Sequence, residues 1–388
     1  MALLGGIILS LSLYPVLYWI LMEMKLYELS IESRPASVDI IIFGLSAMTI
    51  YWVKGRWERF FMTSAFISML VSYQKPWIKF AVAYWFAISF GLLAAQKMRN
   101  WFMDDKRRDQ ILKLVLFAAS MNAVWVIVQM LNIDLITVPS EGAHGEWFYT
   151  GFFGNPNDLG IFLAISLPLV FCCGKWSTKL FLFAFLGFAL WIMQSTMSFL
   201  AAIVGLFSYL AFIGISLKNL VFILMVGTLA AVFFLIFVDR PKYSDLIRFR
   251  IMKRSAQIAM QKPLFGHGLA SFAIVFAHNT RKEANMRDGP RSPIHVLNEY
   301  IETLFEQGFL GLFALFALMI SVLKRSLKMP MSPPRAAAIA GLTALAANSL
   351  GFYPLHIPLL ALMALIFYAI ALSETKSRGI KDGKCFDH

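Results

Sequence analysis

The stretch IKFAVAYWFAISFGLLAAQKMRNWFMDDKRRDQILKLVLFAASMNAVWVIVQMLNI, residues 78–133, holds two long apolar runs on either side of a short basic segment. Each run has about the 20 residues that an α-helix needs to cross a lipid bilayer. The basic segment carries five Lys and Arg residues: Lys97, Arg99, Lys106, Arg107 and Arg108. Because Lys and Arg collect in cytoplasmic loops, this pattern predicts two transmembrane helices joined on the cytoplasmic side.

The composition of the whole chain agrees with a membrane protein. Hydrophobic residues make up 59% of the chain and charged residues 15%, whereas a soluble domain carries about 25% charged residues. The 36 Phe and 10 Trp residues are typical of surfaces that face lipid and its interface with water. We therefore predict an all-α polytopic membrane protein.

The net charge of +13 would suggest a nucleic-acid partner if the protein were soluble. Much of this charge lies in predicted cytoplasmic loops, so we expect contacts with membrane lipids and no nucleic acid. The three cysteines, Cys172, Cys173 and Cys385, lack the spacing of a zinc site. The sequence thus indicates no metal and no cofactor.

Further apolar runs bring the predicted number of transmembrane helices to about 12. Their expected ranges are 2–22, 37–53, 58–73, 78–96, 111–133, 158–174, 180–194, 197–217, 220–238, 308–323, 336–350 and 356–373. Alternation from the segment 97–108 puts the other Lys- and Arg-bearing short loops in the cytoplasm, together with both termini.

One long segment, 239–307, breaks this charge rule because alternation places it outside the cytoplasm. It holds eleven Lys and Arg residues against seven carboxylates, and three of the six histidines. Long loops cross the membrane largely regardless of charge. The basicity suggests an anionic ligand, such as a phosphate-bearing lipid head group. The alternative is a solvated basic face that contacts anionic lipids.

Residues 248–272, RFRIMKRSAQIAMQKPLFGHGLASF, predict an amphipathic helix at the membrane interface, ended by Pro263. Arg250 and Arg254 are four residues apart and share a helix face. Two guanidinium groups on one face can grip a diphosphate. The turn at 266–268 permits close backbone approach. The alternative for each arginine is an extended side chain that reaches lipid head groups.

Residues 151–171, GFFGNPNDLGIFLAISLPLVF, begin with a Gly- and Asn-rich turn before an apolar run. Asn157 or Asp158 can cap the helix that follows. A cap does not require two asparagines on either side of a proline. Asn155 and Asn157 therefore also suggest a site for sugar hydroxyls at the membrane surface.

Residues 292–316, SPIHVLNEYIETLFEQGFLGLFALF, predict a helix that opens after Ser292 and runs into a membrane span. His295 and Glu299 are four residues apart on it, so they can touch and form a general base. Arg291 adds positive charge where the helix dipole already favours an anion. A solvated histidine on an amphipathic helix is the alternative. His356 in NSLGFYPLHIP, 348–358, is expected on the same side of the membrane, where a structural role is the alternative.

The segments GFFGNPNDLG, PLFGHGLASF, NEYIETLFEQGFLGL and GFYPLHIP, in this order, resemble the O-antigen ligase and O-antigen polymerase superfamily. The resemblance implies a GT-C-like inner-membrane glycosyltransferase that needs no nucleotide sugar and, among the ligases, no metal. It implies transfer of a glycan from undecaprenyl diphosphate to an acceptor glycan, lipid A-core or protein hydroxyl on the periplasmic face. It divides the chain into N-terminal helices (1–144), an O-antigen ligase/polymerase-like region (145–372) with the periplasmic loop 239–307, and a cytoplasmic tail (373–388).

Two positions depart from the family pattern. Family members often carry His directly before Asn298, where this chain has Leu297. Ligase-like members tend to carry Arg after Ser195, where this chain has Thr196. Both departures favour an O-antigen or surface-polysaccharide polymerase over a ligase.

The resemblance and the residues together predict a mechanism. Arg250 would hold the donor diphosphate as charge develops on it, with help from Arg248, Arg254 or Arg291. His295 would orient or deprotonate the acceptor hydroxyl, with His356 as its substitute. The glycan would be held by further side chains: Asn155, Asn157, Asn298 and His356.

A different class of protein, a transporter of lipid-linked sugars, also suits about 12 helices. Transporters usually carry polar groups at the middle of broken helices. The spans of this chain have few ionisable residues, and its polar residues concentrate in outer loops. The sequence therefore favours an enzyme.

Overall fold

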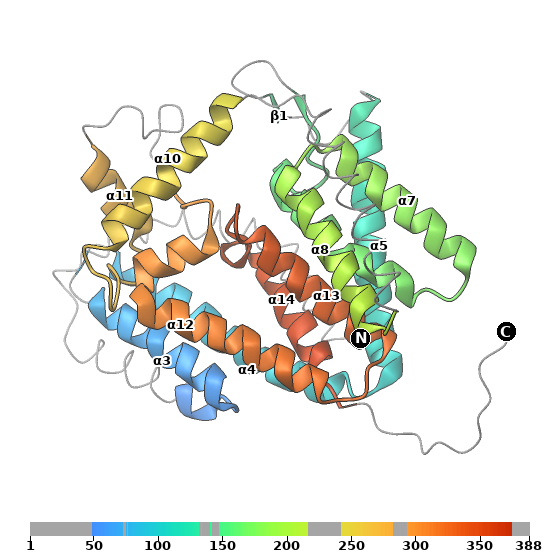
Figure 1. Ribbon diagram of the computed structural model, residues 1–388, viewed down its shortest axis with the longest axis horizontal. Helices are drawn as coiled ribbons and strands as arrows, with labels where there is room; N and C mark the ends of the chain where they lie inside the picture. The colour runs from blue at the N-terminus through green and yellow to red at the C-terminus, as the bar shows by residue number, and fades with distance from the viewer. Residues whose placement is uncertain are drawn as a thin grey trace.

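A computed structural model describes residues 49–72, 75, 77–131, 133, 140–141, 147–215, 242–281 and 293–374 (Figure 1). These residues are helical apart from turns, connecting segments and one antiparallel strand pair, β1 (Ser140–Glu141) and β2 (Trp147–Phe148). The longer helices are α3 (Arg56–Val71), α4 (Ile78–Trp101), α5 (Asp105–Met130), α6 (Pro156–Ser166), α7 (Trp176–Ile192), α8 (Thr196–Phe212), α10 (Lys242–Ala259), α11 (Phe272–Thr280), α12 (Glu299–Leu327), α13 (Pro333–Asn348) and α14 (Pro358–Ala371). Two 3-10 helices are η3 (Leu167–Cys172) and η5 (Pro354–His356).

Among the described residues, three helices are long and apolar enough to cross a membrane, namely the Phe80–Trp101 part of α4, α5 and α12. Shorter apolar helices are α6 with η3, α7, α8 and α14. The prediction of an all-α chain with several apolar helices is confirmed. The predicted spans 2–22 and 220–238, and most of 37–53, lie outside the described residues, so the number of about 12 stays a prediction.

The predicted start of one helix is wrong. The sequence predicted a helix that opens after Ser292, but α12 begins at Glu299. The Oδ1 atom of Asn298 accepts a hydrogen bond from the Ile301 amide at 3.0 Å and caps the helix there. Just before this cap, Leu297 has a left-handed φ of 63°. His295 therefore lies in a non-helical segment and is not one turn below Glu299.

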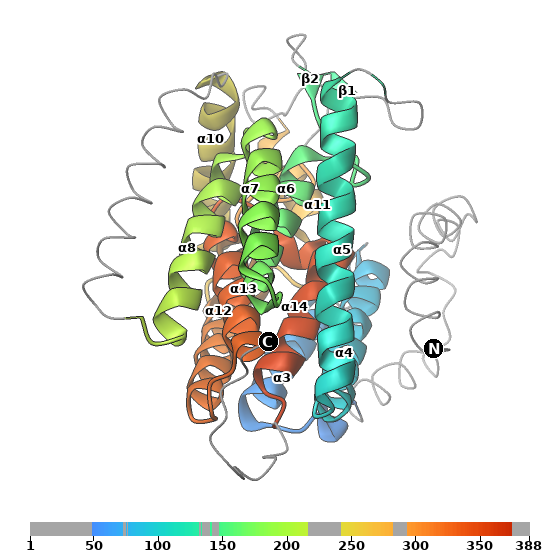
Figure 2. The same cartoon turned by 90° about the vertical axis from the view of Figure 1, so that its right-hand side faces the viewer.

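The helix bundle has two ends (Figure 2). In this view α5 and α7 run nearly along the vertical, and β1 and β2 lie beside the upper end of α5. We call the end with residues 97–108 the basic end, and the opposite end, with Asn155, His295 and His356, the site end. At the basic end the Tyr368 hydroxyl donates to Glu58 Oε1 at 2.6 Å, and Arg325 donates to the same oxygen. These bonds join α14, α12 and α3.

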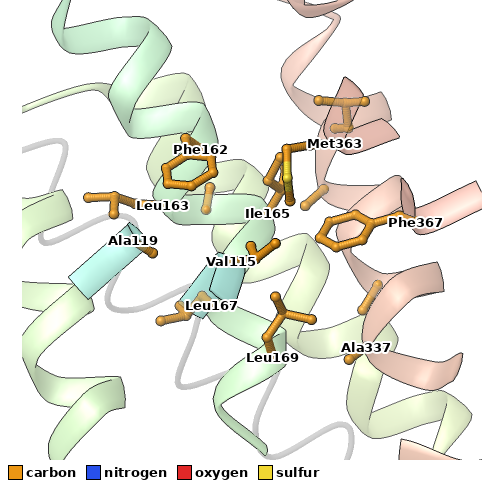
Figure 3. Close-up of a cluster of buried hydrophobic side chains, with 14 of the residues drawn as sticks. Val115, Ala119, Phe162, Leu163, Ile165, Leu167, Leu169, Ala337, Met363 and Phe367 are labelled. Carbon is orange, nitrogen blue, oxygen red and sulfur yellow. The ribbon is translucent and has the colours of Figure 1, made fainter. Parts of the chain in front are cut away.

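The main core surrounds α6 and η3 (Figure 3). Phe162, Leu163 and Ile165 of α6 and Leu167 and Leu169 of η3 are buried against neighbouring helices, among them α5, α13 and α14. The facing side chains come from α5 (Val115 and Ala119), α13 (Ala337) and α14 (Met363 and Phe367). Since α6 and η3 are surrounded in this way, their nearly continuous apolar sequence is explained by protein contacts as well as by lipid. The N-terminal end of α6 is held rigidly at the site end.

The segment after α10 lies directly on a break in α12. Gly308 has a φ of 67° and ψ of −168° and interrupts the helix. The amides of His267 and Gly268 donate to the carbonyls of Phe305 and Glu306 at 2.8 and 2.9 Å, and the Phe309 amide donates to Pro263 at 2.7 Å. A Cβ on Gly266 would meet the Glu306 backbone at 2.3 Å. The close backbone approach predicted for the turn at 266–268 is thus made to a helix of the bundle.

The predicted amphipathic helix is present as α10. One face packs on α11 and α12 through the buried residues Ile251 and Ile258. Arg250 lies on the exposed face. Arg248 is two residues away, which on an α-helix is about 200° around the axis, and it is partly buried. The helix therefore directs these two arginines to different surroundings.

Candidate functional site

A chain of polar side chains crosses the site end. Asn155 caps α6, because its Oδ1 accepts a hydrogen bond from the Asn157 amide at 2.9 Å. The cap leaves the Asn157 side chain free to accept a hydrogen bond from the Ser195 hydroxyl at 3.2 Å. Ser195 and Ser198 hydroxyls lie 2.9 Å apart, and Asn348 Nδ2 donates to Ser198 at 3.4 Å. The ends of α6, α8 and α13 thus meet through neutral polar groups.

The side chains of Asn157, Ser195, Ser198 and Asn348 line a small open recess with an enclosed volume of about 10 Å³. Its lining residues come from α6, α8, α10 and α13 and the turn after α13: Asn157, Ile161, Ser195, Met197, Ser198, Arg248, Asn348, Gly351 and Phe352. Arg248 is the only charged residue among them. The recess therefore combines one guanidinium with hydroxyl and amide groups, a set suited to a phosphate beside a sugar.

His295 is connected to this recess through two stacked aromatic rings. The His295 ring stacks on Tyr353 with 4.1 Å between ring centroids, and Tyr353 stacks on Phe352 at 4.4 Å. Phe352 lines the recess. Burial raises the pKa of Tyr353 to about 12, and nearby Arg248 opposes this shift. Tyr353 therefore keeps its phenol proton at neutral pH.

A buried carboxylate sets the orientation of His295. Its Nδ1 donates to Glu302 Oε1 at 2.7 Å, and the Val296 amide donates to Glu302 Oε2 at 3.0 Å. The Glu302 side chain is 1% exposed and that of His295 is 28% exposed. An ionised carboxylate only accepts hydrogen bonds, so the proton of a neutral His295 lies on Nδ1 and Nε2 is the basic nitrogen. The predicted partner Glu299 is not the one that His295 uses.

Glu299 instead faces His356. The Nδ1 atom of His356 lies 3.2 Å from Glu299 Oε1, and its Nε2 lies 3.4 Å from Glu302 Oε1. The His356 ring also stacks on Tyr84 of α4, at 4.9 Å. Burial by itself lowers the pKa of His356, but Glu302 and Glu299 outweigh it and raise the pKa to about 10. His356 is thus a largely buried imidazolium at neutral pH, which fits a structural cation better than a base.

Three side chains of this cluster have the chemistry of metal ligands. His295, Glu302 and His356 each offer one ligand atom, and these atoms lie within 4.8 Å of one another. A metal would have to replace the hydrogen bond between His295 and Glu302 and the proton of His356. Their mutual pairing already gives each charge a partner. This group was not predicted because His356 comes from a distant segment, and because the predicted helix paired His295 with Glu299 and not with Glu302.

The structure brings some predicted site residues together and separates others. Arg248 and Asn157 line the recess, whereas Asn155 and Asn298 are helix caps. Asn298 also donates from Nδ2 to the Leu350 carbonyl at 2.7 Å.

Of the other predicted arginines, Arg250 is exposed and Arg254 is partly buried and donates to Gln257 at 3.4 Å. Arg291 lies outside the described residues. Arg250 and Arg254 do share a helix face, but this face is turned away from the recess that Arg248 lines.

Sequence reasoning missed four residues of the site: Glu302, Ser195, Ser198 and Asn348. Glu302 was overlooked because the predicted helix began too early and gave His295 a different neighbour. The hydroxyls and the amide stand at helix ends in the sequence, where a capping role is the usual interpretation. The short polar breaks before α8 and after α13 were the available signal.

Comparison with protein families finds one match. Residues 181–316 match the family described as O-antigen ligase, Wzy_C. This range includes the segments PLFGHGLASF and NEYIETLFEQGFLGL, and it lies inside the predicted region 145–372. The resemblance drawn from the motifs is therefore confirmed over this part of the chain. No curated protein shows a significant match.

Proposed function

We propose that the chain is an inner-membrane glycosyltransferase that moves a glycan from undecaprenyl diphosphate to a hydroxyl of an acceptor. The family match supports the class of enzyme, because this family comprises transferases of lipid-linked glycans. The observation that carries the proposal is a histidine oriented by a buried carboxylate, connected through Tyr353 and Phe352 to a recess lined by Arg248.

In this proposal the basic end faces the cytoplasm and the site end faces the periplasm. Lys97, Arg99 and Lys106 to Arg108 then follow the positive-inside rule. The chain has about 12 transmembrane helices, in the manner of GT-C enzymes, and the loop 239–307 is periplasmic. A polyprenyl donor in the membrane can reach a recess at this end without crossing the bilayer.

His295 is the proposed general base. Its Nε2 atom removes the proton of the acceptor hydroxyl while the acceptor oxygen attacks the anomeric carbon of the donor sugar. The bond from that carbon to the diphosphate oxygen breaks, and undecaprenyl diphosphate leaves with the electron pair. Direct displacement inverts the anomeric centre. A positioned general base contributes about 10²–10⁴-fold to a reaction rate.

Arg248 is the proposed principal ligand of the diphosphate, since it is the charged group of the recess. Arg250, Arg254 and Arg291 attract the anionic donor from the surrounding surface and act on its approach. A guanidinium held close to the developing charge stabilises the transition state more than an exposed one does. We therefore assign to Arg248 the role in diphosphate binding that the sequence predicted for Arg250.

A surface-polysaccharide or O-antigen polymerase remains the favoured member of the class. Leu297 replaces the histidine that family members often carry, and Thr196 replaces an arginine. An O-antigen ligase with a lipid A-core acceptor and a protein O-oligosaccharyltransferase share the same chemistry and differ in acceptor. A lipid-linked sugar transporter would not need a histidine–carboxylate pair beside the recess.

Purified protein with a lipid-linked glycan and an acceptor tests the proposal, with release of undecaprenyl diphosphate as the readout. Wild-type protein is expected to release it. His295→Ala is expected to reduce the rate by about 10²–10⁴-fold, and Arg248→Ala by about 10²–10³-fold.

The matched controls are His278→Ala and Arg281→Ala, because both residues are exposed at α11, away from the recess. Their rates should equal that of the wild type. Transport of intact lipid-linked glycan without any release would reject the enzyme in favour of a transporter.

A further inference from the structure

Three polar side chains lie deep among apolar helices at the bottom of the recess. Ser195, Ser198 and Asn348 are 4%, 1% and 1% exposed. Polar groups inside a membrane-embedded bundle cost free energy unless they are paired, and they commonly mark a functional site.

Helix capping does not explain Ser195. It occupies the N-cap position of α8, where serine is a preferred residue, yet its hydroxyl makes no capping hydrogen bond. The hydroxyl points instead to Asn157 and Ser198. Ser198 likewise uses its hydroxyl between helices and not within its own.

Asn348 has an amide oxygen that nothing satisfies. Its Nδ2 makes one long bond to Ser198, and its buried Oδ1 has no hydrogen-bond partner among the described residues. Leaving such a buried atom unpaired costs free energy. Asn348 lines the recess, so a ligand there can complete its hydrogen bonds. Exchange of the amide nitrogen and oxygen would leave a donor facing the recess in place of an acceptor.

The recess suits a small neutral group better than a second anion. Its interior offers hydroxyl and amide groups, each able to donate and accept, and its one charged lining residue is Arg248. The enclosed volume of the recess is about 10 Å³, which is room for roughly one water-sized group. It admits a single hydroxyl group of a sugar, while the ring itself stays at the mouth of the recess.

We infer that Ser195, Ser198 and Asn348 form a recognition subsite for one hydroxyl group of a sugar ring, the ring bonded to the diphosphate of the donor. The inference rests on the proposed function, in which Arg248 holds the adjacent phosphate. These three residues select the donor sugar by the presence and orientation of that hydroxyl group. A sugar that lacks the matching group leaves buried polar atoms unpaired and binds less tightly.

Direct binding tests this subsite without any need for transfer. The probes are radiolabelled polyprenyl diphosphates that carry glucose, galactose, N-acetylglucosamine or N-acetylgalactosamine. Their dissociation constants are measured on purified protein in detergent. Wild-type protein is expected to prefer one probe, and Ser195→Ala and Ser198→Ala should each reduce that preference by about three- to tenfold, the effect of one lost hydrogen bond.

Ser166→Ala is the matched control. Ser166 is a fully buried hydroxyl of α6 that makes no hydrogen bond among the described residues and does not line the recess. The preference of the Ser166→Ala protein among the four probes should equal that of the wild type. Asn348→Ala is a further variant, and the serine variants keep the test decisive if that protein does not fold.

Two results separate the subsite from the enzymatic proposal. Wild-type discrimination retained in both serine variants, or equal binding of all four probes by the wild type, would overturn the subsite while leaving the release assay unaffected. Failure of the wild type to release undecaprenyl diphosphate would reject the enzyme, and the binding preferences would still report on the subsite.

Discussion

At the scale of single residues, two histidines a few ångströms apart have different chemistry because their surroundings differ. The rings of His295 and His356 lie 5.0 Å apart. His295 has one carboxylate partner and a partly exposed ring, whereas His356 lies between two carboxylates. His356 therefore keeps its proton, whereas Nε2 of His295 is available to accept one. From residue type alone, both histidines were candidates for the group that orients or deprotonates the acceptor hydroxyl.

Replacing Glu302 by Gln should impair catalysis without removing the histidine. The amide no longer fixes the proton of His295 on Nδ1, so the basic nitrogen is lost for part of the population. We expect the turnover number to fall by about 10²–10⁴-fold, while donor binding stays near that of the wild type. Steady-state kinetics with the lipid-linked donor measure the turnover number and the KM for the donor separately. Glu374→Gln is the control, because Glu374 is a carboxylate at the basic end. A normal turnover number for Glu302→Gln would show that Glu302 does not act in catalysis.

The raised pKa of His356 predicts a pH-dependent stability. The folded pKa of about 10 exceeds the unfolded value of about 6.5, so its stabilising contribution is complete below pH 6.5. It is lost as the pH rises toward 10, with a slope of up to about 1.4 kcal/mol per pH unit. Thermal unfolding in detergent between pH 7 and 10 should show a steeper fall in Tm for wild type than for His356→Gln. Parallel curves would contradict a protonated, ion-paired His356.

At the scale of elements, the segment 263–268 and the break in α12 form one unit. His267 Nε2 donates to the Ile258 carbonyl at 3.0 Å, and burial lowers the pKa of His267, so it stays neutral. Glu306 accepts the Ala270 and Phe272 amides at 2.9 and 3.2 Å. Two of the family-like motifs are therefore explained mainly by backbone packing. This unit fixes α10, and with it Arg248, relative to the first turns of α12.

Gly308→Ala should disrupt this unit. A Cβ there would lie 2.4 Å from the Leu264 backbone, and φ is left-handed, so both strain and a clash oppose the substitution. We expect a loss of at least about 3 kcal/mol, seen as little folded protein by size-exclusion chromatography in detergent. Gly187→Ala is the control because its Cβ meets open space on α7, and it should be neutral or slightly stabilising. Normal folding of Gly308→Ala would show that the contact is not essential.

At the scale of the whole molecule, the site is assembled from distant parts of the chain. Asn157, Ser195, Arg248 and Asn348 line one recess, and Glu302 lies at the same end of the bundle, while the pair of buried Glu58 and partly exposed Arg325 lies at the other end. The polar residues of the site end thus share one side of the membrane in the proposed topology. The side of the membrane from which each end can be labelled therefore tests the proposed topology.

Single cysteines introduced at Gln261 and Lys106 should report opposite sides of the membrane. Both positions are exposed, Gln261 beside the segment on α12 and Lys106 at the basic end. In a background with the native cysteines replaced by Ala, a membrane-impermeant maleimide added to spheroplasts should label position 261 and not position 106. Labelling only after lysis at position 261 would place the recess in the cytoplasm and exclude a periplasmic reaction.

The sequence by itself determined the helical membrane class, the basic connection at 97–108 and the family-like motifs, because hydrophobicity, charge and glycine conformation act locally along the chain. It also singled out Arg248 and Asn157, which line one recess, and His295, which is connected to that recess through Tyr353 and Phe352. Tertiary structure alone decided that His295 pairs with Glu302, that Arg248 and not Arg250 lines the recess, and that two serines and Asn348 meet there. Those outcomes depend on where a helix cap falls and which helix face packs inward. Such choices are settled by contacts between segments that lie far apart in the chain.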